Sequence, residues 1–215
     1  MNRIERFVDY IASLKTPNDY SLNIYAGNSK EAEIKRIFLR YYLDEMKKRN
    51  PTRIFIGEAP GNKGCFNTGV PFTDEFTIST NPFFADIKKN LSADKKQNER
   101  TTTIVWECLS TISTDEYPLM WNIFPFHPSY VDSTHMLAKE RKNRKPNIRE
   151  CELGTEILKE LIDCFDSVHH FYAVGRVPWY KLKKIHPDIT YIRHPSYGGV
   201  NIFRDNFNNI FSSKK

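Results

Sequence analysis

The sequence lacks any apolar run close to the roughly 20 residues that a membrane-spanning helix needs. Its N-terminal segment, MNRIERFVDYIASL, follows the pattern of an amphipathic helix. That segment has neither the apolar core nor the small-residue cleavage site of a signal peptide. We therefore expect a cytoplasmic protein with no membrane partner.

Paired cysteines are also lacking. The four cysteines (Cys65, Cys108, Cys151 and Cys164) are scattered and form no CxxC pair. This spacing argues against a zinc site or a disulfide framework and fits reduced thiols inside a cell. We expect no metal and no cofactor.

Signatures of nucleotide-binding loops are missing as well. The glycine-containing stretch GEAPG, residues 57–61, has neither the Lys-Ser/Thr pair of a P-loop nor the third glycine of a dinucleotide fingerprint. No internal repeat or low-complexity segment occurs. A chain of 215 residues with 40% apolar and 27% charged residues suits one α/β domain, residues 1–215. We expect residues 1–50 to be a helical extension that packs on it, and the protein to be a monomer.

Positive charge is in excess. The net charge is +6 and the isoelectric point is about 9.0, which favours a polyanionic partner such as DNA. A mildly basic protein without a nucleic-acid partner is the alternative. The densest basic cluster, KERKNRKPNIR at residues 139–149, contains Pro and Asn and therefore reads as a loop. Within it, Arg144 and Lys145 are candidates for phosphate contacts.

Short apolar runs alternate with helical patterns from residue 53 onward. Strands are expected at residues 53–57, 119–126, 169–175 and 189–193. Helices are expected at residues 1–15, 30–49, 81–90, 148–165, 177–185 and 198–211. This alternation predicts an α/β fold whose mostly parallel sheet is covered on both faces.

In such a sheet, ligands bind beyond the carboxyl ends of the strands, and the unusual polar motifs all fall there. GEAPG at residues 57–61 follows the first strand, and Asn122 lies in or at the end of the second. Gly175 and Arg176 follow the third strand, and HPSYGG at residues 194–199 follows the fourth. Each motif alone could be a turn or a cap. Together they predict a site at one edge of the sheet.

The side chains at that edge suit a planar polar ring. Glu58 offers a carboxylate, Asn122 an amide and His194 an imidazole. Phe72, in the motif TGVPF, offers a flat aromatic face. An amide that reads the edge of a heterocycle and a ring that covers its face fit a nucleobase better than a phosphate.

Together these motifs resemble the uracil-DNA glycosylase superfamily, and most closely its family-four-like branch. The resemblance is carried, in chain order, by GEAPG, TGVPF, WNIFPFHP, NRKPNIRE, AVGR and HPSYGG. It covers residues 53–211, whereas residues 1–50 carry none of its motifs. It implies a three-layer α/β/α sandwich around a central four-stranded parallel sheet.

The resemblance also implies an activity, the hydrolysis of the N-glycosidic bond of uracil or a related deaminated base flipped out of DNA. Glu58 would help to position the hydrolytic water. The other loop residues implied to line the base site are Gly57, Ala59, Pro60 and Gly61. Phe72 would stack on the base, Asn122 would bond its edge, and His194 would donate to the base as it leaves.

Contacts to the DNA backbone are implied too. Pro195 and Ser196 would grip phosphates, while residues 197–200, which begin with Tyr197 and Gly198, would approach the space that the flipped base leaves. Positive charge near this site would come from Arg144, Lys145 and Arg176.

The sequence departs from the family pattern in two ways. Family-four enzymes bind an iron–sulfur cluster through four cysteines, two of them near the N-terminus, but no cysteine here precedes Cys65, so we expect no cluster. The family's acidic residues after the glycine loop are replaced by NKGC, residues 62–65. Glu58 is then the only carboxylate of the loop, and it could be catalytic or could shape the loop by accepting backbone N–H bonds. Phe66 competes with Phe72 for the stacking role, which the TGVP sequence before Phe72 favours.

Three hypotheses stay open. The first is a monofunctional glycosylase for uracil or a related deaminated base. The second is the same fold with another preference, such as hypoxanthine or mismatched thymine. The third is a glycosylase-fold protein that binds nucleic acid with weak or no excision, for which the missing acidic residues are the hint.

Overall fold

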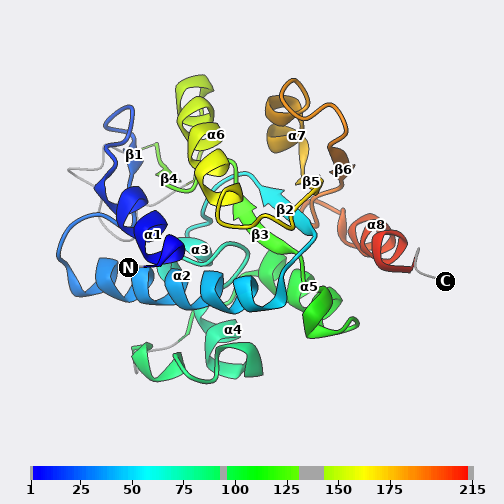
Figure 1. Ribbon diagram of the computed structural model, residues 1–215, viewed down its shortest axis with the longest axis horizontal. Coiled ribbons are helices and arrows are strands. Elements are labelled where there is room, and N and C mark those ends of the chain that lie inside the picture. Colours follow the sequence, from blue (N-terminus) through cyan, green and yellow to red (C-terminus); the bar gives the residue numbers. More distant parts are fainter. Residues whose placement is uncertain (1, 93–95, 131–142, 213–215) are drawn as a thin grey trace.

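A four-stranded parallel sheet forms the centre of the structure (Figure 1), a computed structural model that describes residues 2–92, 96–130 and 143–212. The strands lie in the order β3-β2-β5-β6. They are β2 (Arg53–Gly57), β3 (Leu119–Asn122), β5 (His170–Val174) and β6 (Thr190–Ile192). Every neighbouring pair runs parallel, which confirms the predicted sheet.

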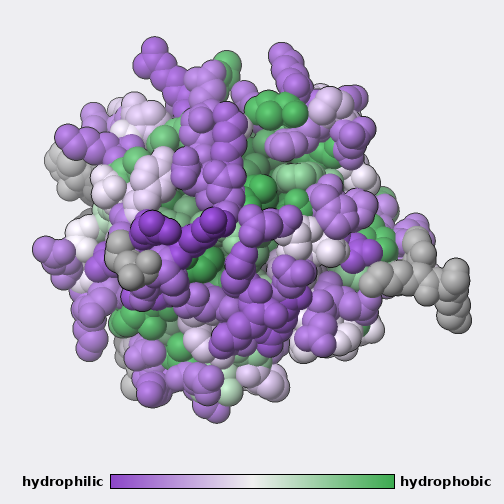
Figure 2. Space-filling model, in the orientation of Figure 1, coloured by the Kyte–Doolittle hydropathy of each residue, from purple (hydrophilic) through white to green (hydrophobic). Residues whose placement is uncertain are grey.

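Helices surround this sheet. The α-helices are α1 (Arg3–Ser13), α2 (Lys30–Arg49), α3 (Cys65–Thr68), α4 (Glu75–Thr80), α5 (Arg100–Leu109), α6 (Ile148–Ile162), α7 (Arg176–Leu182) and α8 (Val200–Ser212). The remaining described elements are the 3-10 helices η1 (Pro82–Phe84), η2 (Lys88–Asn90) and η3 (Thr114–Glu116), and the antiparallel pair of β1 (Ser21–Leu22) and β4 (His127–Pro128). Within the described residues, no helix is long and apolar enough to cross a membrane. Hydrophilic side chains dominate the face seen in Figure 2.

Side chains that alternate along the strands pack on helices of both faces. Trp121 of β3 contacts Phe7 of α1, with ring centroids 5.6 Å apart. Met120 precedes Trp121 on β3, so its side chain points to the other face of the sheet. Phe55 of β2 is in register with Met120 and points to that same face. There its ring centroid lies 6.3 Å from that of Phe211 in α8. The sheet is thus flanked by helices on both faces, as expected.

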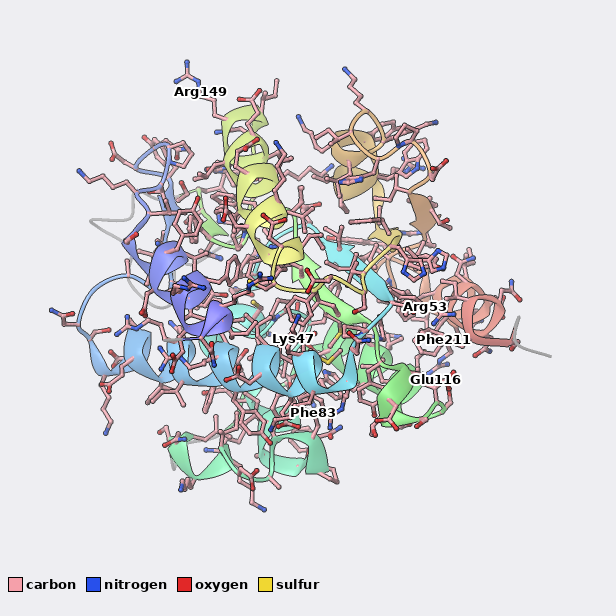
Figure 3. All side chains as sticks on the ribbon, viewed as in Figure 1. Lys47, Arg53, Phe83, Glu116, Arg149 and Phe211 are labelled. Atoms are coloured by element: carbon pink, nitrogen blue, oxygen red, sulfur yellow. The ribbon has the colours of Figure 1, made fainter. Side chains whose placement is uncertain are left out.

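The N-terminal segment packs on the sheet and on one of the motif loops. Tyr42, in α2, accepts a hydrogen bond from the N–H of Met120 at 2.6 Å and so covers the free edge of β3. Phe83 lies beneath α2 in Figure 3, with its ring centroid 6.1 Å from that of Tyr42. Tyr25 donates its hydroxyl to the carbonyl of Gly69, in TGVPF, at 2.7 Å. Residues 1–50 carry no recognised motif, yet they support the loop that contains Phe72.

Two predicted elements differ most from the structure. The helix expected at residues 81–90 is instead the two 3-10 turns η1 and η2, in which the rings of Phe83 and Phe84 both turn into the core, 4.8 Å apart. The strand expected at residues 119–126 ends at Asn122. The next two N–H groups donate to the carbonyls of Gly57 and Glu58, at 2.8 and 3.1 Å, so the chain follows the glycine loop there.

The sequence pattern did not predict α5. The segment RTTTIVWECL contains five β-branched residues, which lower helix propensity. The apolar side chains of Ile104, Val105 and Trp106 are nevertheless buried. Tertiary packing of this helix therefore outweighs its local preference.

Candidate functional site

The carboxyl ends of the strands bring the predicted motifs together. Gly57, the last residue of β2, is paired with Asn122, the last residue of β3. Gly175 follows β5 and donates its N–H to the carbonyl of Ile192, at the end of β6, at 2.9 Å. A Cβ on Gly175 would lie 3.4 Å from the Cβ of His194. The motifs around Gly57, Asn122 and His194 therefore share one edge of the sheet.

Phe72 lies across Gly57, beside Asn122. A Cβ built on Gly57 would lie 2.5 Å from Cζ of Phe72 and 2.7 Å from Oδ1 of Asn122, so glycine permits this close approach. Phe72 has a positive φ of 53°, and Trp106 donates its Nε1–H to the Phe72 carbonyl at 3.1 Å. An aromatic ring and an amide therefore adjoin, an arrangement that suits a planar ring with a polar edge.

The amide of Asn122 is buried and only 4% of the residue is exposed. Its Nδ2 lies 3.8 Å from Sγ of Cys65. Burial raises the pKa of the Cys65 thiol well above its usual range, so the sulfur stays neutral. Gly154 lets α6 pack directly against the residues that follow Asn122, because a Cβ there would lie only 1.7 Å from the carbonyl oxygen of Ile123. The amide thus has a fixed position from which to read a ligand.

His194 presents one defined ring nitrogen. The backbone N–H of Ser196 donates to Nδ1 at 3.1 Å, and the Oγ of Ser196 lies 2.8 Å from the same atom. Because a backbone N–H can only donate, Nδ1 is the acceptor and the neutral ring carries its proton on Nε2. Burial and the nearby charge of Arg193 lower the pKa of His194 to about 4. Near neutral pH, His194 is therefore an uncharged ring with an Nε2–H donor.

The segment after His194 is a tight loop that projects Tyr197. This residue is 97% exposed and has a φ of 49°. Arg193 donates to the carbonyls of Ser196 and Tyr197 at 3.3 and 3.2 Å. A Cβ on Gly199 would lie 2.1 Å from the carbonyl oxygen of His194, so glycine closes the loop. An exposed aromatic residue thereby follows His194 by three positions in one tight loop.

Glu58 is half-buried on the glycine loop. Burial raises the pKa of its carboxyl, and the charge of the nearby Lys145 opposes that rise. In the part of the chain that the structure describes, no hydrogen bond reaches the carboxylate. The alternative in which Glu58 shapes the loop by accepting backbone N–H bonds therefore has no support there.

The glycine loop is held from one side by His127 and Asn143. Nδ1 of His127 lies 3.0 Å from the carbonyl oxygen of Pro60, a contact in which the ring nitrogen must be the donor. Asn143 donates its Nδ2–H to the same carbonyl at 3.2 Å and accepts from the N–H of Asn62 at 3.2 Å. The sequence reading gave Asn143 no role of its own, since no local pattern signals contacts with residues 81 and 83 positions earlier.

Arg144 has a different place from the one expected. Its Nη1 donates to Oε2 of Glu150 at 2.7 Å, and its Nε donates to the carbonyl of Ser129 at 2.8 Å. Glu150 is fully buried. Burial alone would raise the pKa of Glu150, but the hydrogen bonds from Arg144 hold it below its usual range. We therefore assign Arg144 a structural role, as the residue that ties this segment to the start of α6, rather than a phosphate contact.

The other expected DNA contacts differ in exposure. Lys145 and Arg176 are exposed and form no ion pair within residues 2–92, 96–130 and 143–212. Pro195 is buried, whereas Gly198 is exposed with a φ of 75°. The part of the basic cluster at residues 139–142 lies outside the described residues.

Phe66 points away from the site. Its buried ring lies against His127, with centroids 4.6 Å apart, and Nζ of Lys35 lies 4.8 Å from its centroid. Phe66 is therefore part of the support beneath α2. Phe72 is the aromatic ring that adjoins Asn122.

Surface cavities occur elsewhere on the molecule. Two surface cavities of about 230 and about 340 Å³ lie at the amino ends of β5 and β6 and between α1 and α6, away from these residues. No group of three His, Cys, Asp or Glu side chains that could hold a metal ion occurs among the described residues. The site is thus recognised by the convergence of polar groups at the sheet edge.

Comparison with known proteins identifies the fold. No family model matches the sequence, and no curated protein matches it. A solved structure, the crystal structure of WT Pedobacter heparinus SMUG2, is similar with a TM-score of 0.71 and 14% sequence identity. The match covers 99% of this chain and 98% of that one. This chain therefore has the uracil-DNA-glycosylase-like α/β fold of Pedobacter heparinus SMUG2 over almost its whole length.

Proposed function

We propose that this protein is a monofunctional DNA glycosylase that hydrolyses the N-glycosidic bond of uracil, or of a related deaminated base, flipped out of DNA. The observation that carries the proposal is the meeting of Asn122, Phe72 and a neutral His194 at one edge of the sheet. The fold shared with SMUG2 and the net charge of +6 support it.

The reaction explains why a neutral imidazole suits the site. The bond between the sugar C1′ and the base nitrogen breaks with its electron pair going to the base, and water adds at C1′ and loses a proton. Negative charge then grows on a carbonyl oxygen of the base. The Nε2–H of His194 would donate to that oxygen, and a donor held in place typically contributes about 3–4 kcal/mol to such a step.

Asn122 and Phe72 would recognise the base. An amide can accept from a ring N–H and donate to the neighbouring carbonyl, whereas cytosine offers the reversed pattern. Uracil, hypoxanthine and mismatched thymine all present an N–H beside a carbonyl, so this contact keeps all three as candidates. Phe72 would cover the face of the flipped ring.

Glu58 would act on the sugar side. Its carboxylate receives no hydrogen bond from the described residues and lies near Lys145. In that position it would stabilise positive charge on the sugar or orient the attacking water, and proton abstraction from water is not demanding when the electrophile is already cationic.

Exposed residues around this edge would hold the DNA. Tyr197 stands at the tip of its loop, where it would fill the space left by the flipped base. The segment of Pro195 and Ser196 would lie along the phosphate backbone, and Lys145 and Arg176 would add charge. A flipped base loses a few kcal/mol of stacking, which these contacts would help to offset.

The order of the motifs supports a place near the family-four-like branch. All four cysteines are buried and free of disulfides. We propose that this protein works without the iron–sulfur cluster of that branch, since no cysteine precedes Cys65.

An excision assay tests the proposal. Purified protein is incubated with labelled oligonucleotides that contain one uracil, hypoxanthine or mismatched thymine, in single and double strands, and abasic sites are then cleaved with alkali. We expect cleavage at uracil that is lost in Asn122→Ala, while DNA affinity largely survives. Excision of hypoxanthine or mismatched thymine instead of uracil would keep the protein a glycosylase with a different base preference. DNA binding without cleavage of any substrate would favour the binding protein instead.

A further inference from the structure

A carboxylate from a distant part of the chain lies against the glycine loop. Glu99, the residue that precedes α5, occupies the space that side chains at Gly61 and Gly64 would fill. A Cβ on Gly61 would lie 2.6 Å from Oε1 of Glu99, and one on Gly64 would lie 2.0 Å from Oε2. The loop itself contains only the carboxylate of Glu58, so Glu99 supplies a second one from outside it.

Glu99 is also fixed to the segment that carries Phe72. Its backbone N–H donates to Oδ2 of the buried Asp74 at 2.7 Å. The other carboxylate oxygen of Asp74 caps α4 by accepting from the N–H of Thr77 at 2.8 Å. Because Asp74 follows Phe72 by two residues, one aspartate links Glu99 to the aromatic wall of the site.

Glu99 acts on Cys65 through its charge, and Cys65 lies beside the amide of Asn122. Burial, and after it the charge of Glu99, raise the pKa of the Cys65 thiol. The Sγ of Cys65 in turn lies 3.8 Å from Nδ2 of Asn122. Thr102, in the first turn of α5, has a buried Oγ1 without a partner among the described residues, 3.6 Å from the Cβ position of Gly64.

The carboxylate of Glu99 is costly to keep in this place. Burial and the nearby Asp74 raise the pKa of Glu99 to about 6, and Lys63 opposes the rise. No hydrogen bond from the described residues to its side chain offsets that burial. Groups with such perturbed pKa values gather at functional sites.

We propose that Glu99 is a positioning residue whose ionised carboxylate sets the conformation of residues 58–65, and through them the places of Glu58 and Asn122 at the base site. The inference rests on the proposed glycosylase function for its catalytic consequence. Glu99 would thereby provide a carboxylate beside the loop, whereas residues 62–65 of the loop contain none.

A double-mutant cycle tests the contact itself. In Gly61→Ala, the new methyl group would displace the carboxylate of Glu99, the flexible end of that side chain. We expect Gly61→Ala to slow single-turnover excision about tenfold, as for coupled neighbours, but to have little effect in the Glu99→Ala background. Effects of the two substitutions that simply add would overturn the inference.

A second readout does not depend on activity. The amide NMR signals of Gly61 and Gly64 are followed from pH 4.5 to about 8. In the wild type we expect them to shift with a midpoint near pH 6, and in Glu99→Gln we expect that transition to be absent. Glu107→Gln, on the helix that Glu99 precedes but exposed and paired with Arg204, is the matched control and should keep the transition.

Other ionisable groups are separated by the same experiment. Asp74, Lys63 and Cys65 face Glu99 from the neighbouring segments, and Glu58 titrates on the loop. The transition should survive in Glu58→Gln. If the wild type excises no base, the proposed function fails. The titration alone then decides whether Glu99 sets the conformation of the loop. The role of Glu99 would be overturned if the amide signals of Gly61 and Gly64 showed no transition near pH 6, or showed the same transition in Glu99→Gln.

Discussion

The backbone N–H of Ser196 donates a hydrogen bond to Nδ1 of His194 at 3.1 Å. This contact places the ring proton on Nε2 and makes the imidazole a donor without any need for positive charge. The same loop carries Tyr197 out into solvent. The residue proposed to assist the leaving base and the residue proposed to replace it in the duplex are therefore positioned by one short segment.

The burial of His194 has a consequence for stability at low pH. Its pKa is about 4 in the folded protein and about 6.5 in the unfolded chain, so the unfolded chain binds the proton first as pH falls. Folding stability linked to His194 is complete above pH 6.5 and is lost towards pH 4, by about 3 kcal/mol. Urea unfolding should show a smaller loss over this range for His194→Ala than for the wild type. An equal loss in both would contradict a buried neutral ring.

Gly57 sets the distance between Phe72 and Asn122. In Gly57→Ala, the methyl group would meet the Phe72 ring at 2.5 Å and the Asn122 amide at 2.7 Å. We expect both groups to be pushed aside and excision to fall by about one to two orders of magnitude, as when reacting groups are misplaced by about 1 Å. Single-turnover rates measured beside the melting temperature check this. A folded variant with wild-type rates would show that the two groups do not form the base site.

Lys145 and Arg176 are expected to contact phosphates. Neutralising both, as Lys145→Gln with Arg176→Gln, should weaken DNA binding and reduce the slope of log K against log salt by about one per lost contact. Arg144 is left out, because removing it would strand the buried Glu150. Lys159→Gln, at the far end of α6 and paired with Glu156, is the control that should leave the slope unchanged. An unchanged slope in the double variant would place the phosphates elsewhere.

The strand ends and their motifs could be predicted from the sequence, because short apolar runs are bounded there by Gly, Pro and polar residues. The side chains that reach the site from distant segments could not be predicted from the sequence. Glu99 and Asn143 contact the glycine loop from positions far along the chain, and no local pattern reports such contacts. Trp106 donates a hydrogen bond to the carbonyl of Phe72 and lies on α5. The threonines of α5 lower its helix propensity, so the sequence pattern does not indicate a helix there.

The burial of α2 was also only partly predictable. Helical periodicity in residues 30–49 predicts a stripe of Ile34, Ile37, Phe38, Tyr41 and Tyr42. The structure buries Phe38 and Tyr42 but exposes Ile37. The buried face is completed by Leu39 and Leu43. Periodicity identifies the helix, whereas the neighbours decide which face is covered.

Glu99 should show opposite effects on stability and on activity. Its pKa rises from about 4.5 in the unfolded chain to about 6 in the folded protein, so ionisation above pH 6 destabilises the fold. Glu99→Gln should therefore be more stable than the wild type at pH 8, by at most about 2 kcal/mol, with little gain at pH 4.5. Excision should nevertheless be slower. A variant that loses stability at pH 8 would indicate a plain structural role.

The measurement that tests the central claim most directly is single-turnover excision of uracil from a labelled oligonucleotide by the wild type, His194→Ala and His169→Ala. His169 is an exposed histidine next to the opposite end of the sheet, so its variant controls for the loss of an imidazole. The account predicts excision by the wild type and by His169→Ala, and a rate about 100- to 1,000-fold lower in His194→Ala with DNA affinity retained. Excision that is unchanged in His194→Ala would contradict the assigned donor, and no excision by the wild type would contradict the glycosylase itself.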